Sequence, residues 1–119
     1  MVNSPALLET CLHGYNLFRT QSTLSPVEQE VVFLTIGREN GCHYCLAAHS
    51  TLAGKASGVP AEVTDAIRAG TALPDARLDA LSEFTRIMLD SRGWSAASRC
   101  NRAMMALERL TTPSSTQSG

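Results

Sequence analysis

Residues 24–58 read LSPVEQEVVFLTIGRENGCHYCLAAHSTLAGKASG and predict two helices separated by a turn. Ser25 is followed by proline and, three positions after the serine, by Glu28, a pattern typical of a helix start with a capping box. The Glu-Asn-Gly sequence at residues 39–41 predicts a turn. We expect the second helix to occupy about residues 42–55, before a Gly-Val-Pro break.

The same helical periodicity extends on both sides of this segment. The stretch 75–92 is one example, since Leu78, Leu81 and Phe84 fall on one helix face. Aromatic residues make up only 5% of the chain, and no alternating run bounded by turns indicates a strand. We therefore predict an all-α bundle of about six helices. Their expected ranges are 5–20, 26–38, 42–55, 61–69, 75–92 and 95–110.

Length and composition bound the class of protein. The 119 residues predict one domain over residues 1–110, and the polar segment 111–119 predicts a disordered tail because it has nothing to bury. The net charge of −1 provides no basic surface for nucleic acid. No apolar stretch approaches the ~20 residues of a membrane-spanning helix, and the N-terminus lacks the pattern of a secretory signal. We expect a cytoplasmic protein without nucleic-acid or membrane partners.

Two cysteines and a histidine fall on one face of the helix expected at residues 42–55. Cys42 and Cys45 are spaced i, i+3, which makes their side chains neighbours, with Cβ atoms roughly 5–6 Å apart. Cys45 and His49 are spaced i, i+4, so the imidazole lies beside the second thiol. Cys42 falls at the helix start, where free backbone N–H groups and the helix dipole favour a thiolate. This layout suits a thiolate that attacks a peroxide or disulfide and a second thiol that resolves the product.

Residue types and spacing alone leave three interpretations of this cluster open. The first is the redox pair. The second is a zinc site, which needs a fourth ligand from elsewhere in the fold. Candidates for that ligand are Cys11, His13, Cys100 and Glu30. The third is structural, with small buried thiols at a helix start and a hydrogen-bonded His49. We expect the two isolated cysteines, Cys11 and Cys100, to be buried as small apolar side chains.

Glu30 lies in the helix that precedes the cluster, next to two valines. If this residue turns toward the interior, its carboxylate is placed to orient His49 and to hold its proton. A solvated charge on the helix surface is the competing interpretation. The neighbouring Glu28 is explained by the capping box.

The segment quoted above resembles the core motif of the AhpD-like, carboxymuconolactone decarboxylase family. In that motif a helical glutamate precedes a Gly-Cys-x-x-Cys-x-x-x-His helix start. The resemblance covers about residues 20–93. It implies an all-helical fold that assembles into trimers or hexamers, and alkylhydroperoxidase-type activity in the branch with both cysteines.

The resemblance also implies roles for individual residues. Cys45 would attack the hydroperoxide, and Cys42 would resolve the product to a disulfide. Glu30 and His49 would form a proton relay. The implied partners are a hydroperoxide substrate, a dithiol or protein reductant and further copies of the chain, with no metal or cofactor. One alternative is a lactone-decarboxylase type of enzyme, in which His49 and Glu30 do acid–base work without the cysteines. The other is a non-catalytic zinc-binding or structural oligomer.

Two departures from the family pattern affect these expectations. The residue before the second cysteine is Tyr44, where the best-known peroxidase branch has histidine. The nearby histidine is His43, which a helix turns about 100° away. We expect His43 to be exposed and Tyr44 either to donate a hydrogen bond or to pack. After Gly93 the sequence loses the family's apolar spacing, so the first five helices are expected to expose apolar surface that seeks a partner chain.

Overall fold

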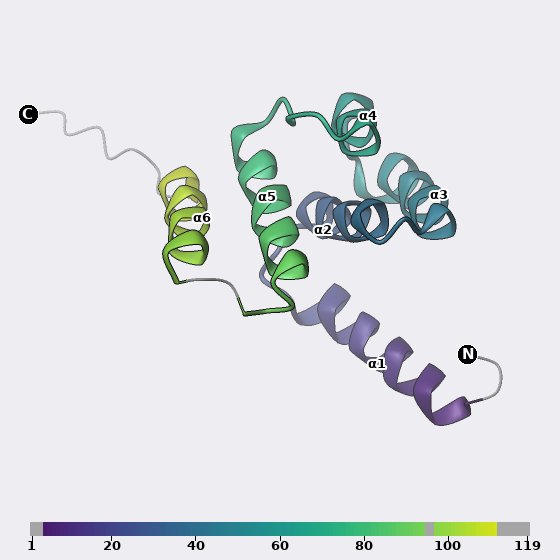
Figure 1. The fold of residues 1–119 in the computed structure, drawn as a ribbon. Helices are drawn as coiled ribbons and strands as arrows, with labels where there is room; N and C mark the ends of the chain where they lie inside the picture. The colour runs from purple at the N-terminus through teal and green to yellow at the C-terminus, as the bar shows by residue number, and fades with distance from the viewer. Residues whose placement is uncertain (1–3, 95–96, 112–119) are drawn as a thin grey trace, which may run out of the picture.

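The computed structural model describes residues 4–94 and 97–111, without the side chains of residues 97–100, 103 and 111. Within these residues the chain forms six α-helices, one π-helical turn and no strand, which confirms the predicted all-α fold (Figure 1). The elements are α1 (Pro5–Gln21), α2 (Pro26–Glu39), α3 (His43–Leu52), the π-helix η1 (Ala53–Ser57), α4 (Ala61–Ala69), α5 (Ala76–Asp90) and α6 (Ala97–Thr111). None of the described helices is both long and apolar enough to cross a membrane. The predicted tail lies outside the described residues, except Thr111 at the end of α6.

The start of α2 is a complete capping box, as the sequence predicts. The Glu28 backbone N–H donates to Ser25 Oγ at 3.2 Å, and the Ser25 N–H donates to Glu28 Oε2 at 2.8 Å. The other carboxylate oxygen of Glu28 accepts a hydrogen bond from Arg77 Nε of α5 at 2.5 Å. One buried side chain therefore fixes both the beginning of α2 and the position of α5 against it.

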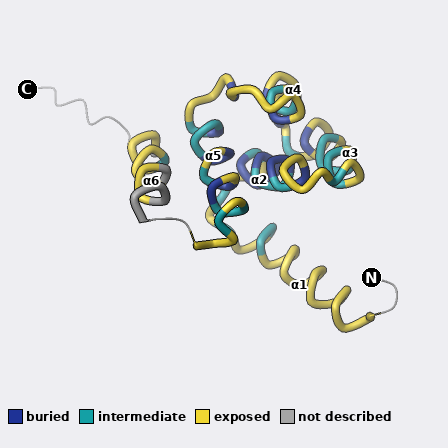
Figure 2. Tube along the Cα trace, in the orientation of Figure 1, coloured by how far each residue is buried: buried dark blue, intermediate teal, exposed yellow. Residues whose placement is uncertain are grey.

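The core forms around α2, which contacts α3, α4 and α5. Figure 2 shows buried residues gathered along α2 and on the faces of its neighbours that point toward it. Val31 and Leu34 of α2 are fully buried, as is Ala53 of η1. The core is completed by Val59, Val63, Ile67, Leu73, Leu78 and Leu81. Burial of apolar surface is the main favourable contribution to folding. Because this cluster packs against α2 from several sides, it holds α2 in place.

The first helix, α1, has no buried residue. Figure 1 shows it extending away from the other helices, and only its last turns reach α2. There Tyr15 and Phe18 contact Phe33, with ring centroids 5.4 and 5.2 Å apart. The prediction that Cys11 is buried is wrong: Cys11 is exposed, because the part of α1 before this contact has no core beside it. The corresponding prediction for Cys100 concerns a side chain outside the described residues.

The helix expected at residues 42–55 ends in a π-helical turn. The α-helical hydrogen bonding stops at Leu52, and η1 continues to Ser57 before Gly58, whose φ of 69° ends the helix. The Val59 N–H donates to the carbonyl of Ala53 at 3.0 Å. This wider turn leaves Ala53 in the core and directs the chain into α4.

We expect Glu28→Gln to lower the free energy of unfolding by about 1–2 kcal/mol at pH 7, because the charge-assisted bonds to Arg77 and the helix start weaken. Burial raises the pKa of Glu28, but hydrogen bonds from the Ser25 backbone and the Arg77 guanidinium outweigh it and leave that pKa below its usual 4.5. A lowered folded-state pKa stabilises the fold above pH 4.5, and that contribution is lost as the pH falls through the folded value.

Urea denaturation at pH 7 and in steps below pH 4.5 tests this expectation. The difference between Glu28→Gln and the wild type should shrink on acidification. Glu62, an exposed glutamate in the first turn of α4, provides the control, since Glu62→Gln should change stability little at any pH. A difference for Glu28→Gln that does not change with pH would contradict the role given to its charge.

Candidate active site

The two cysteines of the motif lie at the N-terminus of α3, as their spacing predicts. Cys42 is the N-cap residue, and its Sγ accepts a hydrogen bond from the Cys45 backbone N–H at 3.2 Å. The two residues form a disulfide, with Cα atoms 5.3 Å apart. Both side chains are partly accessible rather than enclosed in the core. The pair is therefore placed where thiol–disulfide exchange with an external molecule is sterically possible.

Glu30 is fully buried and contacts His49, so the interpretation of Glu30 as a solvated charge is wrong. Its Oε2 lies 2.9 Å from His49 Nδ1. Because a carboxylate oxygen only accepts hydrogen bonds, this contact assigns a hydrogen to Nδ1 and leaves Nε2 as the free nitrogen of a neutral ring. His49 lies one helical turn after Cys45 on α3. The structure thus brings the acid–base pair to the helix that holds the cysteines.

Arg19 is a member of this cluster that the sequence analysis missed. Its Nη2 donates to Glu30 Oε1, its Nη1 to Gln29 Oε1 at 3.1 Å, and its Nε to the Tyr15 hydroxyl at 2.9 Å. Burial lowers the pKa of Arg19, but the contacts with Glu30 and Tyr15 outweigh burial and raise that pKa. The only signal in the sequence is an arginine in the last turn of α1, and its partners Gln29 and Glu30 lie across a loop in α2.

The ring of Phe33 contacts both side chains that bind Glu30. His49 stacks on it with centroids 4.6 Å apart and an interplanar angle of 12°, and the Arg19 guanidinium carbon is 4.9 Å from the ring centroid. Phe18 packs edge-on against the same ring. An aromatic face attracts a guanidinium and restricts the orientation of an imidazole. Phe33 therefore limits the positions that Arg19 and His49 occupy.

The close approach of α3 to α2 depends on Gly37. A Cβ atom added at this buried position would lie 3.2 Å from Cys45 Cβ and 3.5 Å from the backbone nitrogen of Leu46. The separation from Cys45 Cβ is shorter than relaxed packing of carbon against carbon, whereas the separation from the Leu46 nitrogen is an ordinary van der Waals contact. The absence of a side chain at residue 37 thus allows the second cysteine to lie directly against α2.

The remaining residues raised by the sequence do not join this cluster. His43 is exposed, as predicted, and His13 is exposed on α1. Tyr44 is 83% exposed, so of its two predicted roles packing is wrong, because the first turn of α3 points this side chain into solvent. Among the described residues, no three or more histidine, cysteine, aspartate or glutamate side chains lie close enough to bind a metal together.

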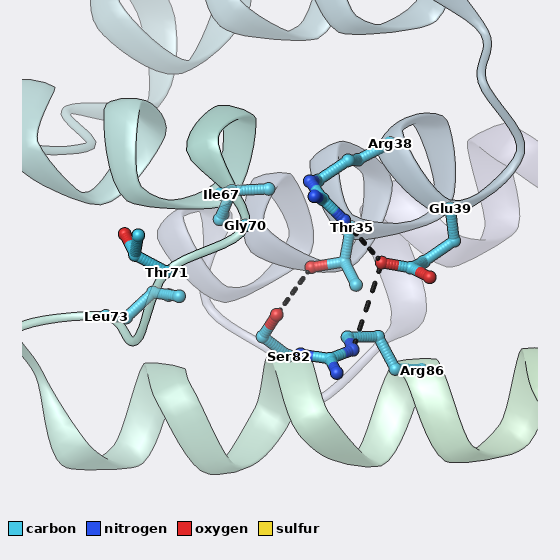
Figure 3. A pocket seen from close by; sticks show the side chains of 9 residues that line it. All are labelled: Thr35, Arg38, Glu39, Ile67, Gly70, Thr71, Leu73, Ser82 and Arg86. Carbon is cyan, nitrogen blue, oxygen red and sulfur yellow. Dashed lines mark hydrogen bonds and ion pairs between the residues drawn. The ribbon is translucent and has the colours of Figure 1, made fainter.

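A separate hollow lies between α2, the end of α4 and α5 (Figure 3). At its base the hydroxyls of Thr35 and Ser82 are 2.9 Å apart. At its rim Glu39 pairs with Arg38 at 3.0 Å and with Arg86 at 3.8 Å. The volume is about 20 Å³, which accommodates about one water molecule. The polar contacts around this hollow join α2 to α5. The hollow itself is too small for an organic substrate.

Comparison with protein families matches most of the chain. A model of the carboxymuconolactone decarboxylase family matches residues 5–86, a range that includes Arg19, Glu30, both motif cysteines and His49. A comparison with individual curated proteins gives no match.

We expect Gly37→Ala to destabilise the protein and Gly14→Ala to stabilise it by up to about 1 kcal/mol. Both glycines lie inside helices, where alanine is intrinsically favoured by this amount. A Cβ at Gly14 meets nothing within 4 Å, whereas one at Gly37 presses on Cys45. Thermal unfolding of the two variants makes the comparison, and equal stabilisation by both would show that α3 does not require the gap at Gly37.

Proposed function

We propose, since the chain belongs to the carboxymuconolactone decarboxylase family, that it is a thiol peroxidase of the alkylhydroperoxidase type. The observation that carries this proposal is the Cys42–Cys45 pair at disulfide distance, on the helix that holds His49 against the buried Glu30. Decarboxylation does not use a redox-active cysteine pair, whereas a two-cysteine thiol peroxidase uses one cysteine to attack the peroxide and the other to form the disulfide.

In the proposed reaction the Cys45 thiolate attacks the outer oxygen of a hydroperoxide. The O–O bond breaks, Cys45 becomes a sulfenic acid, and the alkoxide leaves as an alcohol after it takes up a proton. The Cys42 thiol then attacks the Cys45 sulfur, which forms the disulfide and releases water. An external dithiol reduces the disulfide by exchange and leaves as its own disulfide, so electrons and atoms balance over the cycle.

His49 and Glu30 move the protons in this cycle. His49, one turn from Cys45, takes the thiol proton as general base and returns it to the leaving alkoxide. Glu30 hydrogen-bonds to Nδ1 and so keeps Nε2 available for this exchange. The helix N-terminus stabilises negative charge on Cys42 when that residue is reduced.

The reductant class follows from the chemistry of the pair. Reduction of the Cys42–Cys45 disulfide takes two electrons, which a dithiol or a dithiol protein supplies. Such donors are kept reduced in the cytoplasm, and we propose this compartment for the reaction.

The alternative of a lactone-decarboxylase type of reaction draws support from one contact. The Glu30–His49 hydrogen bond is complete without either sulfur atom, so acid–base chemistry on a small carboxylated ring does not need the cysteines. Activity on such a ring that survives replacement of both cysteines would favour this alternative.

We expect Cys45→Ser to abolish hydroperoxide turnover, because a serine hydroxyl does not reduce a peroxide. Cys42→Ser should still consume one equivalent and stop at the sulfenic acid. Mass spectrometry after thiol alkylation, with and without one equivalent of hydroperoxide, measures both outcomes. Wild type should form a peroxide-dependent Cys42–Cys45 disulfide, and turnover by Cys45→Ser at the wild-type rate would refute the assignment. Cys11→Ser is the control, since Cys11 is an exposed cysteine on α1 and should be dispensable.

We also propose that the chain forms a homo-oligomer, a trimer or hexamer as in the family it resembles. Leu8 and Leu12 are exposed along one side of α1. An apolar groove of about 440 Å³ lies between α2 and α5, with Val32, Phe84 and Met88 among its lining residues. Apolar surfaces of this kind are typical of protein–protein contacts.

The expected result of the double substitution Leu8→Lys and Leu12→Lys is a smaller assembly, because two charges would have to be buried at the contact. Light scattering coupled to size-exclusion chromatography measures the mass. Thr10→Lys, an exposed change on the other side of the same helix, should leave the assembly intact. A monomeric wild type would contradict the proposed oligomer.

A further inference from the structure

We propose that Arg19 is a positioning residue of this site, which holds the Glu30 carboxylate against His49 and sets the pH range in which His49 accepts a proton. The proposal rests on the proposed role of His49 as a general base. The proposal gives α1, which lies outside the cysteine motif, a role in positioning Glu30 and His49.

The first step of the argument is the division of the Glu30 carboxylate between two partners. Oε1 accepts from Arg19 Nη2, and Oε2 accepts from His49 Nδ1. Glu30 is 0% exposed, so its charge is compensated by these side chains rather than by bulk water. Arginine remains protonated at every physiological pH, whereas histidine does not. Arg19 is therefore the partner that keeps Glu30 compensated when His49 is neutral.

The second step is that Arg19 itself has a fixed orientation. Each of its three guanidinium nitrogens donates to a different side chain, namely Glu30, Gln29 and Tyr15. Gln29 in turn donates from Nε2 to the backbone carbonyl of Arg19 at 3.3 Å. The faces of Tyr15 and Phe33 lie 5.1 and 4.9 Å from the guanidinium carbon. A guanidinium fork held in this way fixes the position of the carboxylate oxygen that it binds.

The third step concerns the proton on His49. The guanidinium is a permanent positive charge that shares one carboxylate with the imidazole, so it opposes a second positive charge on the ring. Without Arg19, Glu30 would hold the His49 proton to a higher pH. The other ionisable group in this hydrogen-bonded cluster is Tyr15 of α1, which binds Arg19, whereas Cys42 and Cys45 on the helix of His49 are paired in a disulfide. Arg19 therefore contributes the positive charge in this cluster that does not change with pH.

The experiment compares Arg19→Met with Arg19→Lys. Arg19→Met removes the charge and should move the acidic limb of the pH–rate profile to higher pH by about one unit or more. Arg19→Lys keeps the charge but loses the fork, so the limb should stay near its wild-type position while the maximal rate falls about tenfold. The ¹⁵N signals of the His49 ring, followed by NMR across the same pH range, should show the same displacement for Arg19→Met.

Arg77→Met is the matched control, because Arg77 also pairs with a glutamate of α2, Glu28, but lies outside the site. This control should lower stability without moving the pH profile. An Arg19→Met variant that loses stability yet keeps the wild-type pH profile and ring titration would overturn the inference. If Arg19→Met does not fold, Arg19→Lys decides, and a full wild-type maximal rate in that variant would overturn the positioning role.

The two proposals fail in different ways. A wild-type protein without peroxide turnover would refute the proposed function. The NMR titration of His49 would still test the effect of Arg19, because it needs no substrate. A displaced titration in Arg19→Met then supports the inference, and an unchanged one rejects it.

Discussion

The arrangement of the site depends on one buried carboxylate. Glu30 lies in the interior of the bundle, where an unpaired negative charge would cost several kcal/mol, on the order expected for a desolvated ion. The fold meets this requirement with one partner from each of two neighbouring helices, Arg19 from α1 and His49 from α3. Electrostatic compensation of Glu30 therefore specifies how three helices meet, and the same contacts orient the imidazole on the helix that follows Cys42. Under the proposed function, the residue that needs this compensation is also the one that orients the general base.

Much of the fold follows from local signals in the sequence. The capping box at Ser25 and Glu28 and the apolar spacing in α5 are properties of short segments, and the helices that they predict are present. The relation of Cys42, Cys45 and His49 was also predictable, since spacing along one helix fixes which side chains are neighbours. In each case the atoms that interact are separated by no more than a few residues, so no knowledge of tertiary packing is needed.

The parts that the sequence does not specify depend on contacts between helices. Glu30 is buried because other helices surround α2. The apolar pattern of α2 did not predict whether the Glu30 side chain points inward or outward. Arg19 reaches the site only because α1 meets α2 at Phe33, an approach that no motif records. The exposure of Cys11 has the same origin, since the apolar spacing of α1 predicts a helix but not how far the core extends along it. The family resemblance implied that Glu30 acts together with His49, but it did not indicate Arg19.

The N-cap of α3 is made by sulfur rather than by a serine or aspartate oxygen. The Cys42 sulfur that accepts the Cys45 amide hydrogen also belongs to the disulfide that the proposed function oxidises and reduces. A thiolate accepts such a hydrogen bond more strongly than a disulfide sulfur does, because it bears a full charge. By a thermodynamic cycle, any such difference in cap strength equals a difference in reduction free energy. A change that strengthens the cap more in the thiolate state than in the disulfide state must therefore raise the reduction potential of the cysteine pair by the corresponding amount.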